Sequence, residues 1–402
     1  MENKNIIALI DLGTLTLKCA IFSVENGFTK LIASSKNDTQ GIHNASITNF
    51  DLAVNSVKKC LADAEKKGKI NLNQINVLIN STDIISTRVS KYKRIGGAKI
   101  EKNDISFLLK EAKKQVELND SKLSHIHIFN CKYFVDNKLF KNLPINIFAD
   151  QLSQENAFFS IPKNILKNIA EVFNACDIEI NKFIFSSYAL GTHHFNRDQI
   201  DYGCGIIDIG FEKTSVALFN NSALIHAAVF PIGSNHITKD IARGCYLTEV
   251  ESELIKKDIS IIQNPSDKFL PEKYFSKTRF RKISSKFVQD VIDARIDEIL
   301  KKIFKEINLI QTQGVKHNLI FTGGGSKLND LKKIINNKYS DCQINNDLAN
   351  SNLSNGIDED LLPCYGGAKV LTEGFASEAI AISNSEQTSK KGIFTRIFNV
   401  FN

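Results

Sequence analysis

The sequence predicts an internally duplicated α/β fold, and three polar or glycine-rich turns carry this prediction. Residues 6–24 contain an apolar run, a turn at Asp11 and a second β-rich run, a pattern typical of a hairpin. The same pattern recurs at 204–219, again with an aspartate, Asp208, in the turn. A third turn, rich in glycine, follows an apolar strand at 319–322. Two similar hairpins about two hundred residues apart indicate a duplicated unit.

Composition indicates a folded protein with several domains. The chain has 402 residues, of which 43% are hydrophobic. This size and apolar content favour roughly two to four domains. The formal net charge of +7 is spread along the chain, so nucleic acid is not an expected partner, whereas an anionic membrane surface stays an open alternative. Eight cysteines without a CxxC pair predict reduced thiols.

The N-terminus and the hydropathy pattern predict that the body of the protein is cytoplasmic. The first apolar run is five residues long and ends at Asp11, which is too short and too acidic for a signal peptide. No segment approaches the roughly 20 apolar residues of a membrane-spanning helix.

Three further segments have patterns of their own. Apolar residues recur at helical spacing over 290–310, which predicts an amphipathic helix. Residues 83–160 combine short strands with one helix and have no nucleotide-type turn, so we interpret them as an inserted subdomain. Residues 376–389 are polar and poor in large apolar side chains, as is typical of a flexible linker.

The turns have the residue types that bind a nucleoside triphosphate with magnesium. Such a ligand needs backbone N–H groups near its phosphate oxygens and carboxylates that hold the waters of the metal. Asp11 and Asp208 are the candidate carboxylates for Mg²⁺ bound through water, and glycine lets the backbone approach phosphate closely. The candidates from the pattern itself are Asp11, Gly13, Thr14, Lys18, Asp208, Gly210, Gly323, Gly324 and Gly325. The alternative is that these are structural turns without a ligand.

The histidines and the other motifs exclude several classes of site. His193 and His194 are adjacent, and His125 and His127 alternate along a predicted strand, but no Cys or carboxylate falls at ligand spacing around either pair. We therefore expect exposed histidines or histidines with satisfied hydrogen bonds. The chain also lacks a Gly-x-Ser-x-Gly motif, a Cys/His pairing and a Walker-type lysine loop, which argues against hydrolases and P-loop proteins.

The C-terminal tail, residues 390–402, has the pattern of an amphipathic helix. At about 100° per residue its apolar side chains fall within one sector of roughly 160°. Lys390, Lys391 and Arg396 would meet anionic headgroups. The alternative is a helix docked on its own domain. The candidate membrane-facing residues are Ile393, Phe394, Ile397, Phe398 and Phe401.

Together these motifs resemble the superfamily of actin, sugar kinases and DnaK-type chaperones, and within it the FtsA family of actin-like cell division proteins. The resemblance covers nearly the whole chain. Residues 11–14 are similar to the family's first phosphate loop, 208–210 to its second and 322–331 to its adenosine loop. Residues 186–192 and 365–371 are similar to its two connecting segments.

Three stretches point to the FtsA family within that superfamily. Residues 226–244 follow the second phosphate loop as in the family, and the next segment supplies Glu253 and Lys256 at the positions of the family's nucleoside contact. Residues 83–160 resemble subdomain 1C, and a short amphipathic tail follows a variable linker. The resemblance adds these candidates for the nucleotide site: Thr16, Lys213, Thr214, Gly233, Glu253, Lys256 and Ser326.

The second phosphate loop departs from the family pattern. The family usually has D-x-G-G-G-T, whereas Phe211, Glu212 and Lys213 follow Gly210 here. The first loop has Thr16 where many members have lysine. ATP with Mg²⁺ stays the favoured ligand, and at most a slow ATPase is expected.

The resemblance implies a two-lobed actin-like ATPase fold of duplicated ribonuclease-H-like domains with an inserted subdomain 1C. The implied boundaries are 1–82 and 161–201 for subdomain 1A, 83–160 for 1C, 202–240 for the first part of 2A, 241–314 for 2B, 315–375 for the rest of 2A with the return to 1A, 376–389 for the linker and 390–402 for the membrane helix.

The implied function is a peripheral protein that tethers FtsZ filaments to the cytoplasmic face of the inner membrane at the division site. ATP would tune self-association into filaments, and subdomain 1C would bind other division proteins. A PilM-like adaptor of pilus assembly and, from another class, a sugar or metabolite kinase are the alternatives. A kinase needs a catalytic carboxylate for its substrate, and the sequence offers no clear candidate.

The resemblance also places a partner site in the second lobe. In the family, subdomain 2B receives the C-terminal tail of FtsZ, and Arg295 matches an arginine of the family's R-x-x-E-I helix. Arg295 and Lys286 are the candidate contacts for an acidic peptide. The alternative is that these charges form a solvated helix face.

Overall fold

The chain folds into two compact units. Unit 1 comprises residues 1–205, 217–229 and 347–402, and unit 2 comprises residues 206–216 and 230–346. The computed structural model describes residues 5–25, 28–258, 269–310, 318–328, 331, 334–335, 343–344, 358–375 and 377–378.

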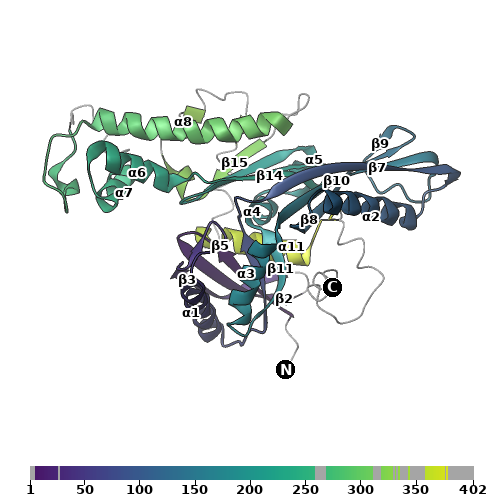
Figure 1. Cartoon of the computed structure of the whole chain (residues 1–402), viewed down its shortest axis with the longest axis horizontal. Helices are drawn as coiled ribbons and strands as arrows, with labels where there is room; N and C mark the ends of the chain where they lie inside the picture. Colours follow the sequence, from purple (N-terminus) through teal and green to yellow (C-terminus); the bar gives the residue numbers. More distant parts are fainter. Residues whose placement is uncertain are drawn as a thin grey trace. The chain divides into compact units, whose positions relative to one another are not determined.

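Unit 1 contains a five-stranded sheet with the order β11-β6-β1-β2-β3. Figure 1 labels its strands β2, β3 and β11. The strands are β1 (Asn5–Leu12), β2 (Thr16–Glu25), β3 (Phe28–Asp38), β6 (Gln74–Ile79) and β11 (Glu179–Phe185). The pairs β1/β2 and β2/β3 are antiparallel, and the pairs β1/β6 and β6/β11 are parallel. Ile10 and Ile21 are fully buried, as expected for continuous apolar runs in a sheet with covered faces.

Four helices surround this sheet. They are α1 (Phe50–Gly68), α3 (Lys163–Asn174), α4 (Ser186–His194) and α11 (Leu362–Thr372). Helix α1 packs on β2 and β3, whereas α4 and α11 pack on each other. A Cβ added at Gly366 would lie 1.9 Å from the Ala189 carbonyl oxygen, and one at Gly367 would lie 2.4 Å from the Leu9 side chain. The two glycines of α11 thus let it approach α4 and β1 closely.

Short elements complete this part of unit 1. They are β4 (Ile42–His43), β5 (Ser46–Ile47), α5 (Arg197–Tyr202) and the 3-10 turn η4 (Glu359–Leu361).

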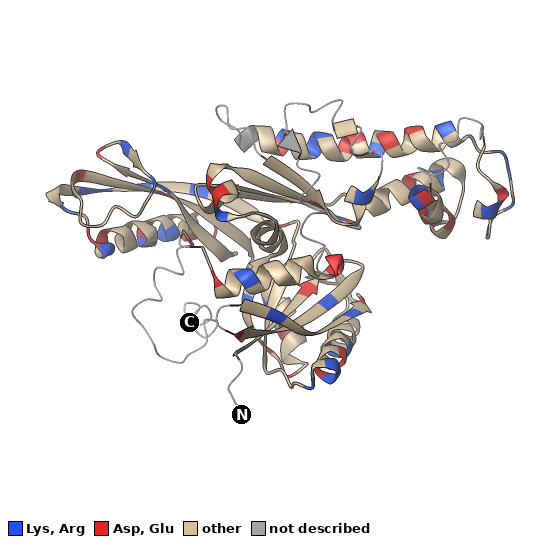
Figure 2. Cartoon of the chain, turned by 180° about the vertical axis from the view of Figure 1, so that it is seen from behind, with Lys and Arg blue, Asp and Glu red and all other residues tan. Residues whose placement is uncertain are grey.

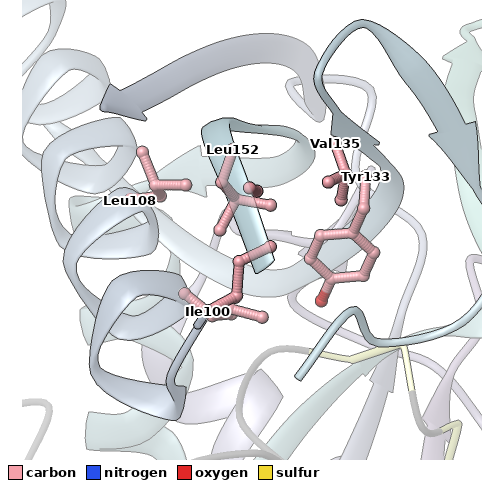
Figure 3. Close-up of a cluster of buried hydrophobic side chains, with 7 residues drawn as sticks. Ile100, Leu108, Tyr133, Val135 and Leu152 are labelled. Carbon is pink, nitrogen blue, oxygen red and sulfur yellow. The ribbon is translucent and has the colours of Figure 1, made fainter. Parts of the chain in front are cut away.

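Residues 85–162 form a separate four-stranded antiparallel sheet within unit 1, with the order β7-β10-β8-β9. Its elements are β7 (Ile85–Lys99), α2 (Lys102–Asn119), β8 (Leu123–Val135), β9 (Lys138–Phe140) and β10 (Phe148–Pro162). Figure 3 shows the core of this segment, in which Leu108 of α2 faces Leu152 of the sheet, with Val135 and Tyr133 on the other side of Leu152. The segment that we interpret as an insertion therefore has a sheet and a core of its own.

A second five-stranded sheet has the order β14-β13-β12-β15-β16. Its strands are β12 (Cys204–Ile209), β13 (Thr214–Asn220), β14 (Ala223–Phe230), β15 (Asn318–Thr322) and β16 (Gln343–Ile344). In chain order, both five-stranded sheets read third, second, first, fourth, fifth strand. This repetition is the duplication that the two hairpins predict.

In the part of unit 2 that the structure describes, the helices with assigned bounds are α6 (Ser234–Cys245), α7 (Glu249–Asp258) and α8 (Ser285–Ile310), and the 3-10 turns are η1 (Glu272–Tyr274) and η2 (Gly324–Lys327). Helix α8 begins five residues before the predicted start at 290. Its buried face includes Ile292, Ile296 and Ile303. Figure 2 shows that acidic and basic residues occur along the length of this helix.

Of the predicted linker and tail, residues 376–402, the structure describes only Ser377 and Glu378. The tail 390–402, with all five candidate membrane-facing residues, lies outside the described residues. The predicted linker starts too early, because its residues Ser377 and Glu378 are docked on unit 1, where Glu378 is buried. A linker can begin only after this point. Among the described residues, no helix is long and apolar enough to cross a membrane.

Candidate functional site

The first hairpin turn lies in unit 1 between β1 and β2. Asp11 is the register partner of Lys18 across the β1/β2 ladder. A Cβ added at Gly13 would lie 2.4 Å from the Thr16 carbonyl oxygen, so the tight turn requires glycine. The Thr39 hydroxyl donates a hydrogen bond to the Gly13 carbonyl at 2.8 Å. Thr39 therefore fixes the turn from outside the hairpin, a role that the sequence did not indicate.

Charged and polar partners surround the Asp11 carboxylate in unit 1. The hydroxyl of Ser186, the first residue of α4, donates to Asp11 Oδ1 at 3.2 Å. The N-terminus of a helix favours a nearby negative charge. Lys18 Nζ lies 3.8 Å from Asp360 Oδ1, and Lys36 also pairs with Asp360. The ammonium group predicted to neutralise phosphate is therefore shared with a carboxylate. Predicted contacts Thr14 and Thr16 lie half-buried at the same turn.

The second hairpin turn, in unit 2, is held by backbone groups of α6. Within the turn, the Gly210 amide donates to the Lys213 carbonyl at 2.8 Å. The amide of Ser234, the first residue of α6, donates to the Gly210 carbonyl at 2.9 Å. A Cβ added at Gly233 would lie 2.7 Å from both Gly210 O and Lys213 N. Predicted residues Gly210, Lys213 and Gly233 therefore come together, and Gly233 is required for this approach.

Glu212, which replaces a family glycine, turns toward α6. Asn235 Nδ2 donates to Glu212 Oε1 at 3.3 Å, and Lys239 Nζ lies 3.4 Å from the same oxygen. The Asn235 amide also donates to the Phe211 carbonyl at 2.7 Å. The extra negative charge at the loop is thus offset by Lys239. The identity of this partner depends on α6 folding back against the turn, so the local sequence could not reveal it.

Thr214 is buried, and its hydroxyl is hydrogen-bonded to another residue of the protein. Its hydroxyl donates to the Ile232 carbonyl at 2.7 Å, and the residue has no exposed surface. This bond joins the start of β13 to the segment that precedes α6. The structure thus gives Thr214 a structural role beside the predicted one.

The glycine loop 323–325 lies directly against the end of β12. Gly323 has a φ of +85°, and a Cβ there would lie 2.3 Å from Asp208 Oδ1. A Cβ at Gly325 would lie 2.3 Å from Ile209 Cγ2, whereas one at Gly324 would meet nothing within 4 Å. Gly323 and Gly325 are therefore needed for close packing, and Gly324 borders open space.

Ser326, the last residue predicted in this loop, closes it locally. Its hydroxyl and its amide both donate to the Gly323 carbonyl, at 2.8 and 3.1 Å. The hydroxyl is therefore already engaged with the loop itself.

Buried Lys256 and partly exposed Glu253 form an ion pair that connects α7 to the start of α6. Lys256 Nζ lies 2.6 Å from Glu253 Oε2 and donates to Thr238 Oγ1 at 2.9 Å and to the Ser234 carbonyl at 3.2 Å. Burial lowers the pKa of Lys256. Burial by itself raises the pKa of Glu253, but the hydrogen bonds from Lys256 and Thr238 bring it below its ordinary value. The pair therefore lies next to Gly233 and the second turn.

Glu251 is a buried carboxylate that the site prediction missed. Its side chain accepts hydrogen bonds from the backbone amides of Thr248 at 2.9 Å, Lys277 at 2.7 Å and Thr278 at 2.8 Å. Burial raises its pKa, but these donors outweigh burial and lower the pKa to about 2. The T-x-x-E spacing at 248–251 is a capping-box signal that could have indicated this role.

The prediction of satisfied histidines holds for His127 of the four-stranded sheet, whereas His125 has a partner at Nδ1 but a buried Nε2 without one among the described residues. His125 Nδ1 lies 2.8 Å from Ser160 Oγ, and His127 Nδ1 lies 2.9 Å from Glu378 Oε1. In the described part of the chain, no cluster of three or more His, Cys, Asp or Glu side chains could hold a metal ion. A magnesium ion would need fewer protein ligands, because it keeps several waters and binds substrate phosphates.

Known proteins similar to this chain point to one family. The family model described as cell division protein FtsA matches residues 205–360. The cell division protein FtsA of Bacillus subtilis is 23% identical over 334 residues, which cover 81% of this chain and 74% of that protein. Cell division protein FtsA of Buchnera aphidicola is 24% identical over 349 residues, covering 82% and 81% of the two chains. The chain is similar to the FtsA family of cell division proteins over most of its length.

Solved structures show that this chain has the actin-like fold. The PilM-PilN type IV pilus biogenesis complex contains a chain with a TM-score of 0.59 and 13% identity, with coverage of 92% of this chain and 97% of that chain. MreB5 of Spiroplasma citri bound to ADP matches with a TM-score of 0.51 and 13% identity, covering 96% and 100%. The predicted fold class is confirmed.

The residues that the FtsA resemblance assigns to a partner lie on α8 in different environments. Arg295 binds Asp240 of α6 through two hydrogen bonds, Nε to Oδ2 at 2.5 Å and a terminal nitrogen to Oδ1 at 3.0 Å. It also contacts Glu298. Lys286 has a side chain that is 79% exposed and pairs with Asp290 at 2.6 Å. Arg295 therefore connects two helices of unit 2 and is not simply a solvated charge, whereas Lys286 is on the surface.

Proposed function

We propose that the chain is a nucleotide-binding, actin-like division protein that tethers FtsZ filaments to the cytoplasmic face of the inner membrane at the division site. The cell-division part is supported by the similarity to the cell division protein FtsA. The nucleotide part rests on one observation, the contact of the Gly323 backbone with the Asp208 carboxylate. This contact brings a glycine loop to the aspartate of the second hairpin turn, as a ligand with phosphates and a metal requires.

The residues present fit ATP with Mg²⁺. Gly324 borders open space, so its backbone leaves room for a ligand. Glu212, the residue that would repel phosphate, is paired with Lys239. Asp11 and Asp208 would hold the waters of Mg²⁺, which when bound would neutralise phosphate charge.

We further propose that ATP turnover is slow. The second turn is bound to α6 through the Gly210 and Phe211 carbonyls, and a bulky pair of residues occupies the family's glycine positions. A scaffold whose assembly responds to bound nucleotide does not need rates near the enzyme median of about 10 per second.

Calorimetry with ATP and Mg²⁺ tests the nucleotide proposal. Asp208→Ala removes the carboxylate and is expected to weaken binding at least about tenfold, because a charged group at a metal–phosphate site is lost. Asp293→Ala, on α8 and outside the turns, is the matched control and should bind as wild type does. Absence of measurable affinity in the wild type, or fast turnover with a sugar as acceptor, would reject the proposal in favour of no ligand or of a kinase.

The membrane part of the proposal rests on the tail sequence. An apolar sector flanked by Lys390, Lys391 and Arg396 is suited to lie in the plane of an anionic bilayer. A single short helix binds weakly, so self-association into filaments would supply avidity. Phe398→Glu is expected to abolish co-sedimentation with vesicles that contain phosphatidylglycerol, whereas Asn399→Gln, on the polar face, should not. Unchanged co-sedimentation after deletion of 390–402 would exclude this site.

The FtsZ part of the proposal needs a test that separates binding from stability. Arg295→Glu would break the α6–α8 ion pair as well as any peptide contact. The charge-swapped variant Asp240→Arg/Arg295→Asp restores an internal pair but moves the positive charge. Exposed Lys286→Glu leaves the fold alone. We expect both variants to bind a labelled FtsZ tail peptide at least about fivefold more weakly by fluorescence anisotropy, through lost charge complementarity. Wild-type affinity in both would place the peptide elsewhere.

Partners of the inserted segment are proposed from its surface. Tyr92 and Phe148 of the four-stranded sheet are 67% and 66% exposed, and exposed aromatic side chains are common in protein interfaces. We propose that this segment, the equivalent of subdomain 1C, binds other division proteins or a second copy of the chain. Tyr92→Ser with Phe148→Ser should reduce filament formation seen by electron microscopy while ATP affinity is kept.

A PilM-like adaptor is the second candidate, because the PilM-PilN complex contains a chain with this fold. Fluorescence microscopy of the tagged chain in dividing cells separates the two. A ring at midcell supports the division role, and foci at pilus sites support the adaptor.

A further inference from the structure

The described end of the chain is docked on unit 1 through its backbone. The Glu378 amide donates to the Phe375 carbonyl at 2.9 Å, which closes a turn. The Asn130 amide of β8 donates to the Ser377 carbonyl at 2.7 Å, and Phe129 forms an antiparallel bridge with Glu378. The chain thus adds two residues to the edge of β8 opposite β10.

The Glu378 side chain enters a buried, charged site. Only 4% of the residue is exposed. Its Oε1 lies 2.9 Å from His127 Nδ1 of β8 and 3.2 Å from Lys182 Nζ of β11. A register shift in β11 separates Ile180 from Lys182, and such bulges re-aim side chains. Two sheets of unit 1 therefore contribute to one carboxylate site.

The hydrogen bonds fix the protonation of His127. Its Nε2 accepts from the Phe185 amide at 3.1 Å, so the ring proton is on Nδ1 and donates to Glu378. Burial keeps the pKa of His127 below its ordinary value. Burial alone raises the pKa of Glu378, but the His127 hydrogen bond and Lys182 lower it below the ordinary range. The site therefore holds an ionised carboxylate with a neutral histidine and a lysine as partners.

An aromatic wall closes the site. Tyr188 of α4 has its ring centroid 4.9 Å from that of His127, 5.3 Å from that of Phe129 and 5.5 Å from that of Phe375. Phe375 comes from the docked end of the chain and packs on α4. Apolar and charged contacts thus act on the same four-residue stretch.

We propose that this is an intramolecular docking site whose ligand is the end of the described chain at residues 375 and 377–378, with Glu378 as the anchor. It also ties β8 of the four-stranded sheet to β11 and α4. An ionised carboxylate is costly to bury without its partners. When Glu378 leaves the site, β8, β11 and α4 therefore lose this shared connection at the same time. If the tail binds membrane as proposed above, only the eleven residues 379–389 separate this anchor from residue 390. Membrane attachment would then act on unit 1 at a defined point beside the inserted segment.

Hydrogen–deuterium exchange of the full chain in solution tests the site, with the Asn130 and Phe185 amides as reporters. Glu378→Ala is expected to speed exchange of both at least about tenfold, the loss of roughly one charged hydrogen bond. Glu373→Ala, an exposed acid at the end of α11, is the matched control and should leave both unchanged. Unchanged exchange at both reporters in Glu378→Ala overturns the proposal. The measurement uses no nucleotide or membrane, so it is independent of the proposed function.

A charge-neutral pair of substitutions tests the site if Glu378→Ala unfolds. Lys182→Met leaves the carboxylate without its cation, and adding Glu378→Gln removes the charge as well. We expect the double variant to exchange more slowly at Asn130 than Lys182→Met alone. If the effects of Lys182→Met and Glu378→Gln simply multiply, the two groups do not act on each other and the docking site is wrong.

Discussion

The two hairpin turns start from the same pattern and are completed by different means. In unit 1, side chains hold the turn, with the Thr39 hydroxyl on Gly13 and the Ser186 hydroxyl on Asp11. In unit 2, the backbone does so, because α6 amides bind the turn carbonyls and Gly323 lies against Asp208. The two halves of a duplicated fold therefore differ in which substitutions they tolerate.

This difference has a physical origin. A side-chain hydroxyl can be replaced with a loss of about 1 kcal/mol, because one hydrogen bond is lost and the backbone keeps its path. A glycine against which another backbone segment packs cannot be replaced without moving that segment. Gly13 is packed against its own turn, whereas Gly233 and Gly323 are packed against separate segments, so the second turn should be the less tolerant of the two. Four measurements test this difference.

The largest effect is expected for Gly323→Ala. The new Cβ would lie 2.3 Å from Asp208 Oδ1 at a backbone φ of +85°, so both overlap and strain oppose folding. We expect a loss of about 3 kcal/mol in the free energy of unfolding, measured by urea denaturation with circular dichroism. The neighbouring Gly324→Ala, where a Cβ meets nothing within 4 Å, should stay within about 0.5 kcal/mol of wild type. If Gly323→Ala and Gly324→Ala lower the free energy of unfolding equally, the close contact at Gly323 is not what makes glycine necessary in this loop.

The next largest effect is expected for Glu251→Gln in unit 2. We expect the free energy of unfolding to fall by about 2 kcal/mol near neutral pH, because charge-assisted hydrogen bonds from three amides are weakened. The folded-state pKa is about 2 against an ordinary value of 4.5. The stabilisation is therefore complete above about pH 4.5 and is lost as the pH falls toward 2. The difference between wild type and variant in urea denaturation should shrink from pH 6 to pH 3. A difference independent of pH would mean that the charge is not what stabilises the loop at 277–278.

A smaller effect is expected for Thr39→Val at the first turn. The change removes the hydrogen bond to the Gly13 carbonyl while it keeps the side-chain shape, and should lower the free energy of unfolding by about 1 kcal/mol. Thr29→Val on β3 is the control and should have no comparable effect. A loss near that of Gly323→Ala would contradict the contrast between the two turns.

The smallest effect is expected for Lys239→Met. Glu212 then keeps its charge beside the second turn without its lysine, so ATP·Mg²⁺ should bind about threefold more weakly by calorimetry, with little change in stability. Added salt should reduce this difference. Lys301→Met on α8 should leave binding unchanged. Wild-type affinity for Lys239→Met would place the Glu212 charge out of reach of the ligand.

The fold class could be predicted from sequence because its signals are local. The apolar runs around Asp11 and Asp208, and the helical spacing over 290–310, determine hairpins and helices through interactions between near neighbours. Segment 83–160 was also separable, since its strand and helix patterns lack a nucleotide-type turn. The family motifs then placed most candidate residues near one of the two turns.

The ion-pair partners of the charged residues could not be predicted from the sequence, because an ion pair depends on which elements pack together. Arginine is a residue type that binds acidic peptides, but the carboxylate that pairs with Arg295 belongs to Asp240, which is 55 residues away in the chain. From its position in the sequence, Glu212 is expected to repel phosphate. In the structure, Lys239 pairs with Glu212 and offsets its charge. Neither partner can be identified from spacing along one helix.

The positions of turns, strands and helices, and of the glycines that the turns need, can be predicted from the sequence, because they depend on backbone sterics and on the period of apolar residues. How each charge is neutralised is visible only in the folded chain. Glu378 shows the reason most clearly. A polar, acidic stretch is typical of a solvated linker, but here folding brings His127 and Lys182 to its carboxylate from two different sheets. Burial of an ion depends on partners that are distant in sequence, and no local pattern records them.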